Sequence, residues 1–141
     1  MSPGEDLEYA KEEFRRRKSA FVIVKAREIL TESKERGVAP FFHAVTSLHG
    51  LKGASLADRI VGKAVAFLCV YAGISSVYTP VVSNPAIAVL RDYSIHVEAG
   101  DTVPMILDRT QNGQCPIEKL IFDCKTPEEA YFILKEKLGG Y

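Results

Sequence analysis

The stretch Ser-Leu-Ala-Asp-Arg-Ile-Val-Gly-Lys-Ala-Val-Ala-Phe-Leu-Cys-Val-Tyr-Ala-Gly, residues 55–73, decides the fold that we predict for this chain. From Ile60 to Val70 it is apolar on almost every side, as in a helix that is covered over most of its surface. Ser55 is a favourable N-cap residue, and Asp58 follows three residues later, where a capping box places an acid. We therefore predict a buried central helix that begins at Ser55.

The elements around this helix are predicted from local patterns. Residues 3–18 have the apolar spacing of an amphipathic helix, the runs 21–24 and 29–31 are typical of a β-hairpin, and another helix opens near Pro40. After the central helix we predict, in order, a strand at 75–83, a helix with Asn84 as its N-cap, strands at 95–97 and 102–108, a helix opened by Cys115-Pro116 and a last helix capped by Thr126. Strands that alternate with helices favour an α/β domain with a mixed sheet covered on both faces.

The composition excludes several classes of protein. With 47% hydrophobic residues among 141, the chain is too apolar for disorder and long enough for one domain, 1–141, with one core. Eighteen basic and eighteen acidic residues leave no net charge, so nothing indicates a nucleic-acid partner. The longest apolar stretch is too short to cross a membrane. Three cysteines without a disulfide pattern, and an N-terminus without a signal-peptide core, predict a cytoplasmic protein.

The order of the predicted elements resembles the cytidine-deaminase fold. In that superfamily a His-Ala-Glu or Cys-Ala-Glu triplet opens the buried helix, and a Pro-Cys-x-x-Cys stretch opens a later helix. The triplet corresponds here to Leu56-Ala57-Asp58, and the second motif to Pro85-Ala86-Ile87-Ala88-Val89. Leu56, Ala86 and Val89 offer no lone pair to zinc. The resemblance implies a three-layer α/β/α sandwich with a mixed sheet but without the zinc ligands, and we expect no metal and no cofactor.

The chain resembles more closely the domain-of-unknown-function family 1893, which consists of short prokaryotic proteins with this fold. The resemblance covers about residues 20–125 and is carried by Arg36-Gly-Val38, Leu51-Lys-Gly-Ala-Ser55, Ala57-Asp-Arg-Ile-Val-Gly-Lys-Ala64, Ser83-Asn-Pro-Ala86 and Cys115-Pro-Ile-Glu-Lys119. Where that family often has Glu before Pro-Ala, this chain has Asn84, so a role for an acid there is not carried over. The resemblance implies no established activity.

The resemblance places the N-termini of the helices that begin at Ser55 and Asn84 side by side at one end of the sheet. Helix N-termini carry unpaired N–H groups and a partial positive charge, which favour anions. Arg59 and Lys63 would add to this charge, and Ser83 would line the same place. The predicted ligand is a small anionic molecule, such as a nucleotide or a phosphorylated metabolite.

Asp58, Lys63 and Cys115 are the candidate catalytic residues. Lys63, a turn or more inside an apolar helix, would lose solvation, which lowers the pKa of an ammonium group; the alternative is a lysine that reaches solvent or pairs with Asp58. Cys115 precedes a predicted helix, where a thiolate is stabilised, with Arg109 six residues before it and Glu118 at the third helical position; the alternative is a structural cap.

Three functions stay open at this point. The first is a non-catalytic module that binds a small anion. The second is a metal-free enzyme that uses Lys63 or Cys115, with Asp58 as acid or base. The third is an interaction protein that uses the fold alone and forms a homo-oligomer. We favour the first and expect a homo-oligomer.

Overall fold

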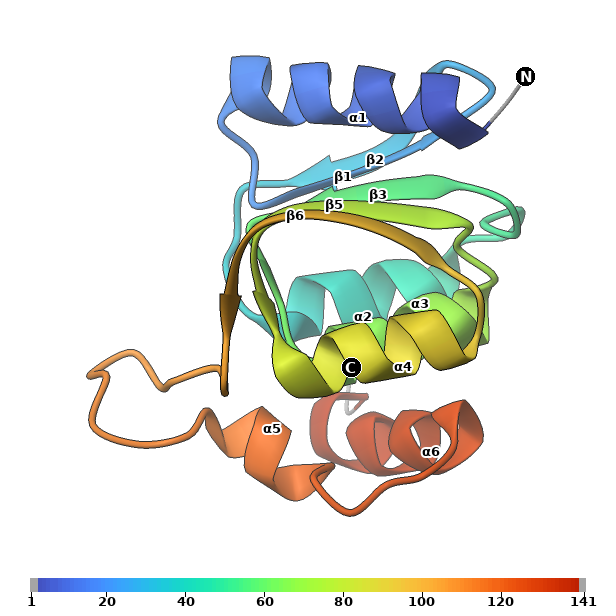
Figure 1. The fold of residues 1–141 in the computed structure, drawn as a ribbon. Coiled ribbons are helices and arrows are strands. Elements are labelled where there is room, and N and C mark those ends of the chain that lie inside the picture. The colour runs from blue at the N-terminus through green and yellow to red at the C-terminus, as the bar shows by residue number, and fades with distance from the viewer. Residues whose placement is uncertain (1–2, 140–141) are drawn as a thin grey trace.

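The computed structural model describes residues 3–139, and its centre is a mixed sheet (Figure 1). The strands are β1 (Phe21–Lys25), β2 (Glu28–Ser33), β3 (Ser55–Asp58), β4 (Ile60–Val61), β5 (Ser76–Ser83) and β6 (His96–Val103). β1 is antiparallel to both β2 and β3, whereas β3, β4 and β6 run parallel to β5. β4 continues the course of β3 along β5, and β6 lies at the margin of the sheet.

Helices cover both faces of this sheet. They are α1 (Pro3–Arg17), α2 (Val38–Ser47), α3 (Lys63–Ala72), α4 (Asn84–Asp92), α5 (Pro116–Leu120) and α6 (Pro127–Leu138). α1 lies over one face, α2, α3 and α4 over the other, and α5 and α6 lie beyond these three (Figure 1). α6 packs against α3, where the rings of Tyr71 and Tyr131 stack at a centroid distance of 4.0 Å. The predicted α/β/α sandwich with a mixed sheet is confirmed.

α1 is joined to the tip of the β1–β2 hairpin by a single carboxylate. Asp6, which is buried on α1, accepts the N–H of Ala26 at 3.0 Å and the N–H of Arg27 at 2.9 Å. Ala26 and Arg27 have φ angles of 52° and 59°, in the left-handed region that residues other than glycine rarely adopt. Asp6 thus holds the turn in a conformation that its own residues do not favour.

The buried helix begins later than predicted. Residues 55–58 and 60–61 are strands that pair with β5, and α3 begins at Lys63 after Gly62 as its N-cap residue. The Ser55 hydroxyl hydrogen-bonds the Ser76 hydroxyl at 2.7 Å instead of capping a helix. The predicted cap at Ser55 is therefore wrong, because a short buried strand and a buried helix have the same apolar composition.

The same shift overturns two predictions about Asp58. Asp58 lies on β3, so it is not the acid of a capping box. Leu56-Ala57-Asp58 is also not the counterpart of the triplet that opens the buried helix, since Gly62 and Lys63 stand at that opening.

The C-terminal third differs from the prediction in one strand and agrees in the last helix. The strands predicted at 95–97 and 102–108 are one strand, β6, which ends before Pro104. The polar residues between the two predicted strands interrupt the apolar pattern, so the sequence does not indicate one continuous strand. Thr126 caps α6 as predicted, because its Oγ1 accepts the N–H of Glu129 at 3.1 Å. Within residues 3–139, no helix has both the length and the apolar character that crossing a bilayer demands.

Candidate functional site

The N-terminus of α3 binds a carboxylate from a distant part of the chain. Glu118 on α5 accepts the N–H of Lys63 with Oε1 at 2.7 Å and the N–H of Ala64 with Oε2 at 2.9 Å. Glu118 is only 6% exposed. Burial raises its pKa, against the opposing effect of the two N–H groups and the Lys63 charge. An internal carboxylate thus occupies the kind of place that we predicted for an anion.

A glycine makes this contact possible. A Cβ atom on Gly62 would lie 2.5 Å from Oε1 of Glu118 and 2.9 Å from Cγ1 of Ile106, so a side chain there would displace one of them. Two of the stretches that carry the family resemblance, Ala57-Asp-Arg-Ile-Val-Gly-Lys-Ala64 and Cys115-Pro-Ile-Glu-Lys119, meet at this point. Glu118 was predicted as a ligand-binding residue; Gly62 was missed, because only the folded chain shows what approaches it.

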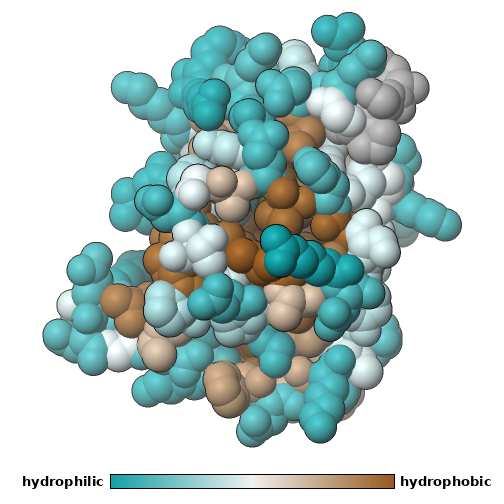
Figure 2. Space-filling view, in the orientation of Figure 1, coloured by the Kyte–Doolittle hydropathy of each residue, from teal (hydrophilic) through white to brown (hydrophobic). Residues whose placement is uncertain are grey.

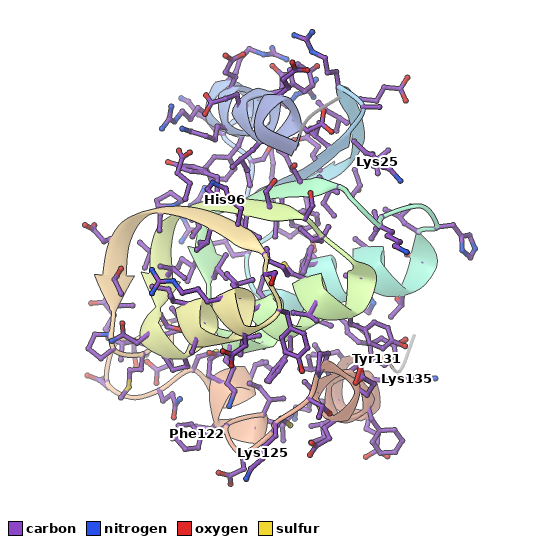
Figure 3. The ribbon with its side chains drawn as sticks, turned by 45° about the vertical axis from the view of Figure 1, so that its right-hand side comes forward. Lys25, His96, Phe122, Lys125, Tyr131 and Lys135 are labelled. Atoms are coloured by element: carbon purple, nitrogen blue, oxygen red, sulfur yellow. The ribbon has the colours of Figure 1, made fainter. Side chains whose placement is uncertain are left out.

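The Lys63 side chain fastens the end of α5. Its Nζ donates to the carbonyl oxygen of Phe122 at 2.8 Å and lies 5.5 Å and 5.9 Å from the ring centroids of Phe67 and Phe122. Phe122 is 57% exposed and lies at the lower rim of the molecule (Figure 3). The prediction that Lys63 lies a turn or more inside the helix is wrong, because Lys63 is the first residue of α3.

α4 begins beside α3, at the same end of the sheet. Val61 pairs with Val82, so the residues that follow, Gly62 and Ser83, open the two helices from neighbouring strands. Ser83 is 1% exposed and caps α4, because its Oγ accepts the N–H of Ala86 at 3.2 Å. Asn84 was predicted as the cap, but it is exposed and is the first residue of the helix.

Asp58 lies apart from the two helix N-termini. It precedes Val61 by three residues, or about 10 Å along the strand direction. Burial raises the pKa of Asp58 to about 7, while the N–H groups of Ile60 and Arg59 and the Arg59 charge oppose the rise. The pKa of Cys69, on α3, is raised by burial and further by the charge of Asp58.

Arg59 connects β3 to β4. Its N–H donates to the carbonyl oxygen of Ala20 at 2.9 Å, and its side chain is half-buried. Because the helix begins after Gly62, Arg59 and Lys63 lie on different elements rather than on one helix.

Cys115 and Arg109 belong to the segment between β6 and α5. Cys115 is half-buried and stands at the N-cap position of α5, but within residues 3–139 its thiol makes no capping hydrogen bond. Arg109 is exposed in a loop that Asp108 organises by accepting the N–H groups of Thr110 at 3.0 Å and Asn112 at 3.2 Å. In the described chain, neither Cys115 nor Arg109 hydrogen-bonds Asp58 or Lys63.

In the described chain, no group of metal-binding side chains lies at this end of α3, and neither do the two surface hollows of about 380 and 250 Å³. Among the described residues, no three His, Cys, Asp or Glu side chains are grouped closely enough to hold a metal ion. Two surface hollows lie elsewhere. One of about 380 Å³ is lined by Glu35, Ala39, Pro40 and His43, and the other, of about 250 Å³, lies between the end of α2 and the end of α3.

The fold and the site together define a class of protein. The antiparallel hairpin, the parallel strands joined by helices on one face and the single helix on the other form a three-layer α/β/α sandwich with a mixed sheet. In it, a glutamate of the same chain closes the N-terminus of the buried helix. The chain belongs to the DUF1893 family, a domain of unknown function whose model matches residues 9–138.

The solved structures that resemble this chain include one of that family. A DUF1893 family protein from Thermotoga maritima superposes with a TM-score of 0.89 at 24% identity, over 97% of this chain and 92% of that one. The apo dCMP deaminase from the cyanophage S-TIM5 has a TM-score of 0.48 at 19% identity, over 70% of this chain and 99% of the deaminase. No curated protein sequence matches the chain.

Proposed function

We propose that the protein is a non-catalytic module that binds a small anionic molecule where α3 and α4 begin. The observation that carries the proposal is the Glu118 carboxylate, which accepts the N–H groups of Lys63 and Ala64 together. This end of α3 therefore offers two N–H groups to an anion with two acceptor oxygens. A phosphate or carboxylate group of a nucleotide or phosphorylated metabolite would take the place of Glu118.

The cationic groups around the α3 N-terminus support the same proposal. The backbone N–H of Lys63 already binds the Glu118 carboxylate. The ammonium group of the same residue donates to the carbonyl oxygen of Phe122 rather than to an acid. It is therefore available to a second charge on the ligand. Burial raises the pKa of Glu118, so lost solvation opposes the internal carboxylate at this place.

The test is a titration of Glu118→Gln with inorganic phosphate and with adenosine monophosphate, followed by the amide resonances of Lys63 and Ala64. Gln removes the charge of the internal competitor at nearly constant size. We expect both probes to shift these resonances in the variant, at concentrations at least tenfold lower than in the parent protein. Glu12→Gln, the same change at an exposed position of α1 on the other face of the sheet, is the matched control and should leave the parent response unchanged. A folded Glu118→Gln variant whose Lys63 and Ala64 resonances ignore both probes would reject the proposal.

A second candidate function is an acid–base role for Asp58. Its pKa of about 7 lies where a carboxyl exchanges protons readily near neutral pH. Such an enzyme would need no metal. Carboxyl-carbon NMR of the parent and of Asp58→Asn measures the midpoint directly. A midpoint for Asp58 below pH 5 would remove this candidate.

A further inference from the structure

β6 leaves one side of the sheet open. It pairs with β5 along nearly its whole length, and within residues 3–139 no strand pairs with its other side. Figure 1 shows β6 at the front of the sheet with its outer side uncovered, and Figure 2 shows apolar surface across the middle of the same face. Such an edge presents a row of unpaired N–H and C=O groups that another strand can pair with.

The hydrogen bonds to β5 determine which residues of β6 face outward. The N–H of His96 donates to the carbonyl oxygen of Ser75, so the backbone groups of His96 point toward β5. In a parallel pair the residues alternate between the two sides of the strand. The backbone groups of Val97, Ala99, Asp101 and Val103 therefore point away from the sheet.

β6 has few of the devices that keep an edge strand from pairing. Natural edges are guarded by charged side chains, above all lysine, by proline or by a bulge. Of these, β6 has two acids, Glu98 and Asp101. β6 holds no lysine and no proline, and Pro104 comes only after its end. By contrast, the pairing of β2, at the opposite margin, shifts register between Ile23 and Val24.

We propose that the partner of this edge is a second copy of the chain, paired antiparallel through β6 about a two-fold axis at Gly100. A two-fold axis perpendicular to the sheet keeps the α1 faces of both copies on the same side. Directly opposed residues of an antiparallel pair have side chains on the same face, so at such an axis one residue of β6 must oppose its own copy. Centred on Gly100, all four outward residues are matched: Val97 opposes Val103 of the second copy, and Ala99 opposes its Asp101. An axis at Ala99 would match only three of them within the strand.

The charges are compatible with this pairing. In the Gly100 register no two acids are opposed, because Asp101 faces Ala99 and Glu98 faces Thr102 of the second copy. Glu98 is already paired with Lys11, while no basic group of the described chain forms an ion pair with Asp101. The chain as a whole has no net charge, so two copies approach without long-range repulsion.

The test is sedimentation equilibrium on the full chain and three variants, from 1 to about 200 μM. The parent chain should show twice the monomer mass. Ala99→Asp places one acid opposite Asp101 of the other copy on each side of the axis and should weaken the dimer about tenfold. Ala99→Lys, at the same exposed position, faces Asp101 and should leave the dimer as strong or stronger. Ala99→Asp combined with Asp101→Lys should restore it.

Three outcomes would overturn the proposal. The first is a parent chain that stays monomeric over the whole range. The second is a dimer that is indifferent to all three variants, which would place the interface on another surface. The third is equal weakening by Ala99→Asp and Ala99→Lys, which would contradict the Gly100 axis. Far-UV circular dichroism of each variant, which should match that of the parent, separates loss of pairing from loss of folding.

Discussion

The N-termini of α3 and α4 begin side by side but are stabilised in different ways. α4 is capped by Ser83, the residue immediately before it, whose hydroxyl accepts the N–H of Ala86. α3 has Gly62 at the same position and receives its cap from Glu118, which is 55 residues away from Lys63 along the chain. One helix end is therefore completed by local sequence, and the other only when α5 docks.

This difference separates two demands on a helix terminus. A hydroxyl accepts one N–H group and is uncharged, so it suits a helix end that stays buried. A carboxylate satisfies two N–H groups and neutralises the helix dipole, but its burial is opposed by lost solvation, as the raised pKa of Glu118 shows. The α3 end thus makes more capping hydrogen bonds than the α4 end. Its carboxylate is also the cap that another anion would displace more easily.

Removal of the distant cap should have the largest effect. Glu118→Ala leaves the N–H groups of Lys63 and Ala64 buried without acceptors, so we expect the free energy of unfolding to fall by about 3 kcal/mol. Urea denaturation measures the change. Glu118→Gln, which keeps one acceptor, should lose about half as much. A loss below about 1 kcal/mol for Glu118→Ala would mean that the cap contributes little in solution.

Obstruction of the cap should cost somewhat less. Gly62→Ala places a Cβ 2.5 Å from Oε1 of Glu118 and forces the carboxylate aside. We expect a loss of about 2 to 3 kcal/mol in the same urea experiment. Gly113→Ala is the control, because its Cβ would meet only Asp108 Oδ2 at 3.8 Å, an ordinary contact. If both substitutions cost the same, the close approach at Gly62 is not what matters.

Asp58 is a carboxyl that accepts backbone N–H groups away from a helix end, so its titration can be compared with the role of Glu118. Its pKa is about 7 when folded and about 4 when unfolded, so the folded state binds the proton more strongly. Stability should therefore fall as pH rises from about 4 to 7. Asp58→Asn should abolish this fall and, since the group is partly exposed, gain about 2 kcal/mol at pH 8 and almost nothing at pH 4. Thermal unfolding across pH 4–8 measures both; equal pH profiles would contradict the shift.

Removal of the local cap should have the smallest effect. Ser83→Ala deletes one hydroxyl acceptor at the start of α4, and we expect a loss of about 1 kcal/mol. Asn84→Ala, one residue later on an exposed position, should change stability by less than about 0.5 kcal/mol. Chemical denaturation of the two variants distinguishes Ser83 from Asn84 as the cap. The reverse order would assign the cap to Asn84.

The parts of the fold that could be predicted are those that neighbouring residues determine. The α1 helix, the hairpin, β5 and the Thr126 cap follow from periodicity and local hydrogen-bonding residues. The start of α3 could not be predicted, because the apolar run from Ile60 onward suits a buried strand as well as a buried helix. The Glu118 cap could not be located either, since it depends on where the segment after β6 returns to the sheet.

The hairpin tip carries a consequence for the motions of the molecule. Ala26 and Arg27 both hold positive φ angles, and the acceptor for their N–H groups is Asp6 on α1. Whenever α1 lifts from the sheet, these two amides lose their acceptor and the turn is free to relax. Hydrogen exchange should therefore open α1 and the hairpin tip as one cooperative unit, at a lower free energy than the strands around β5.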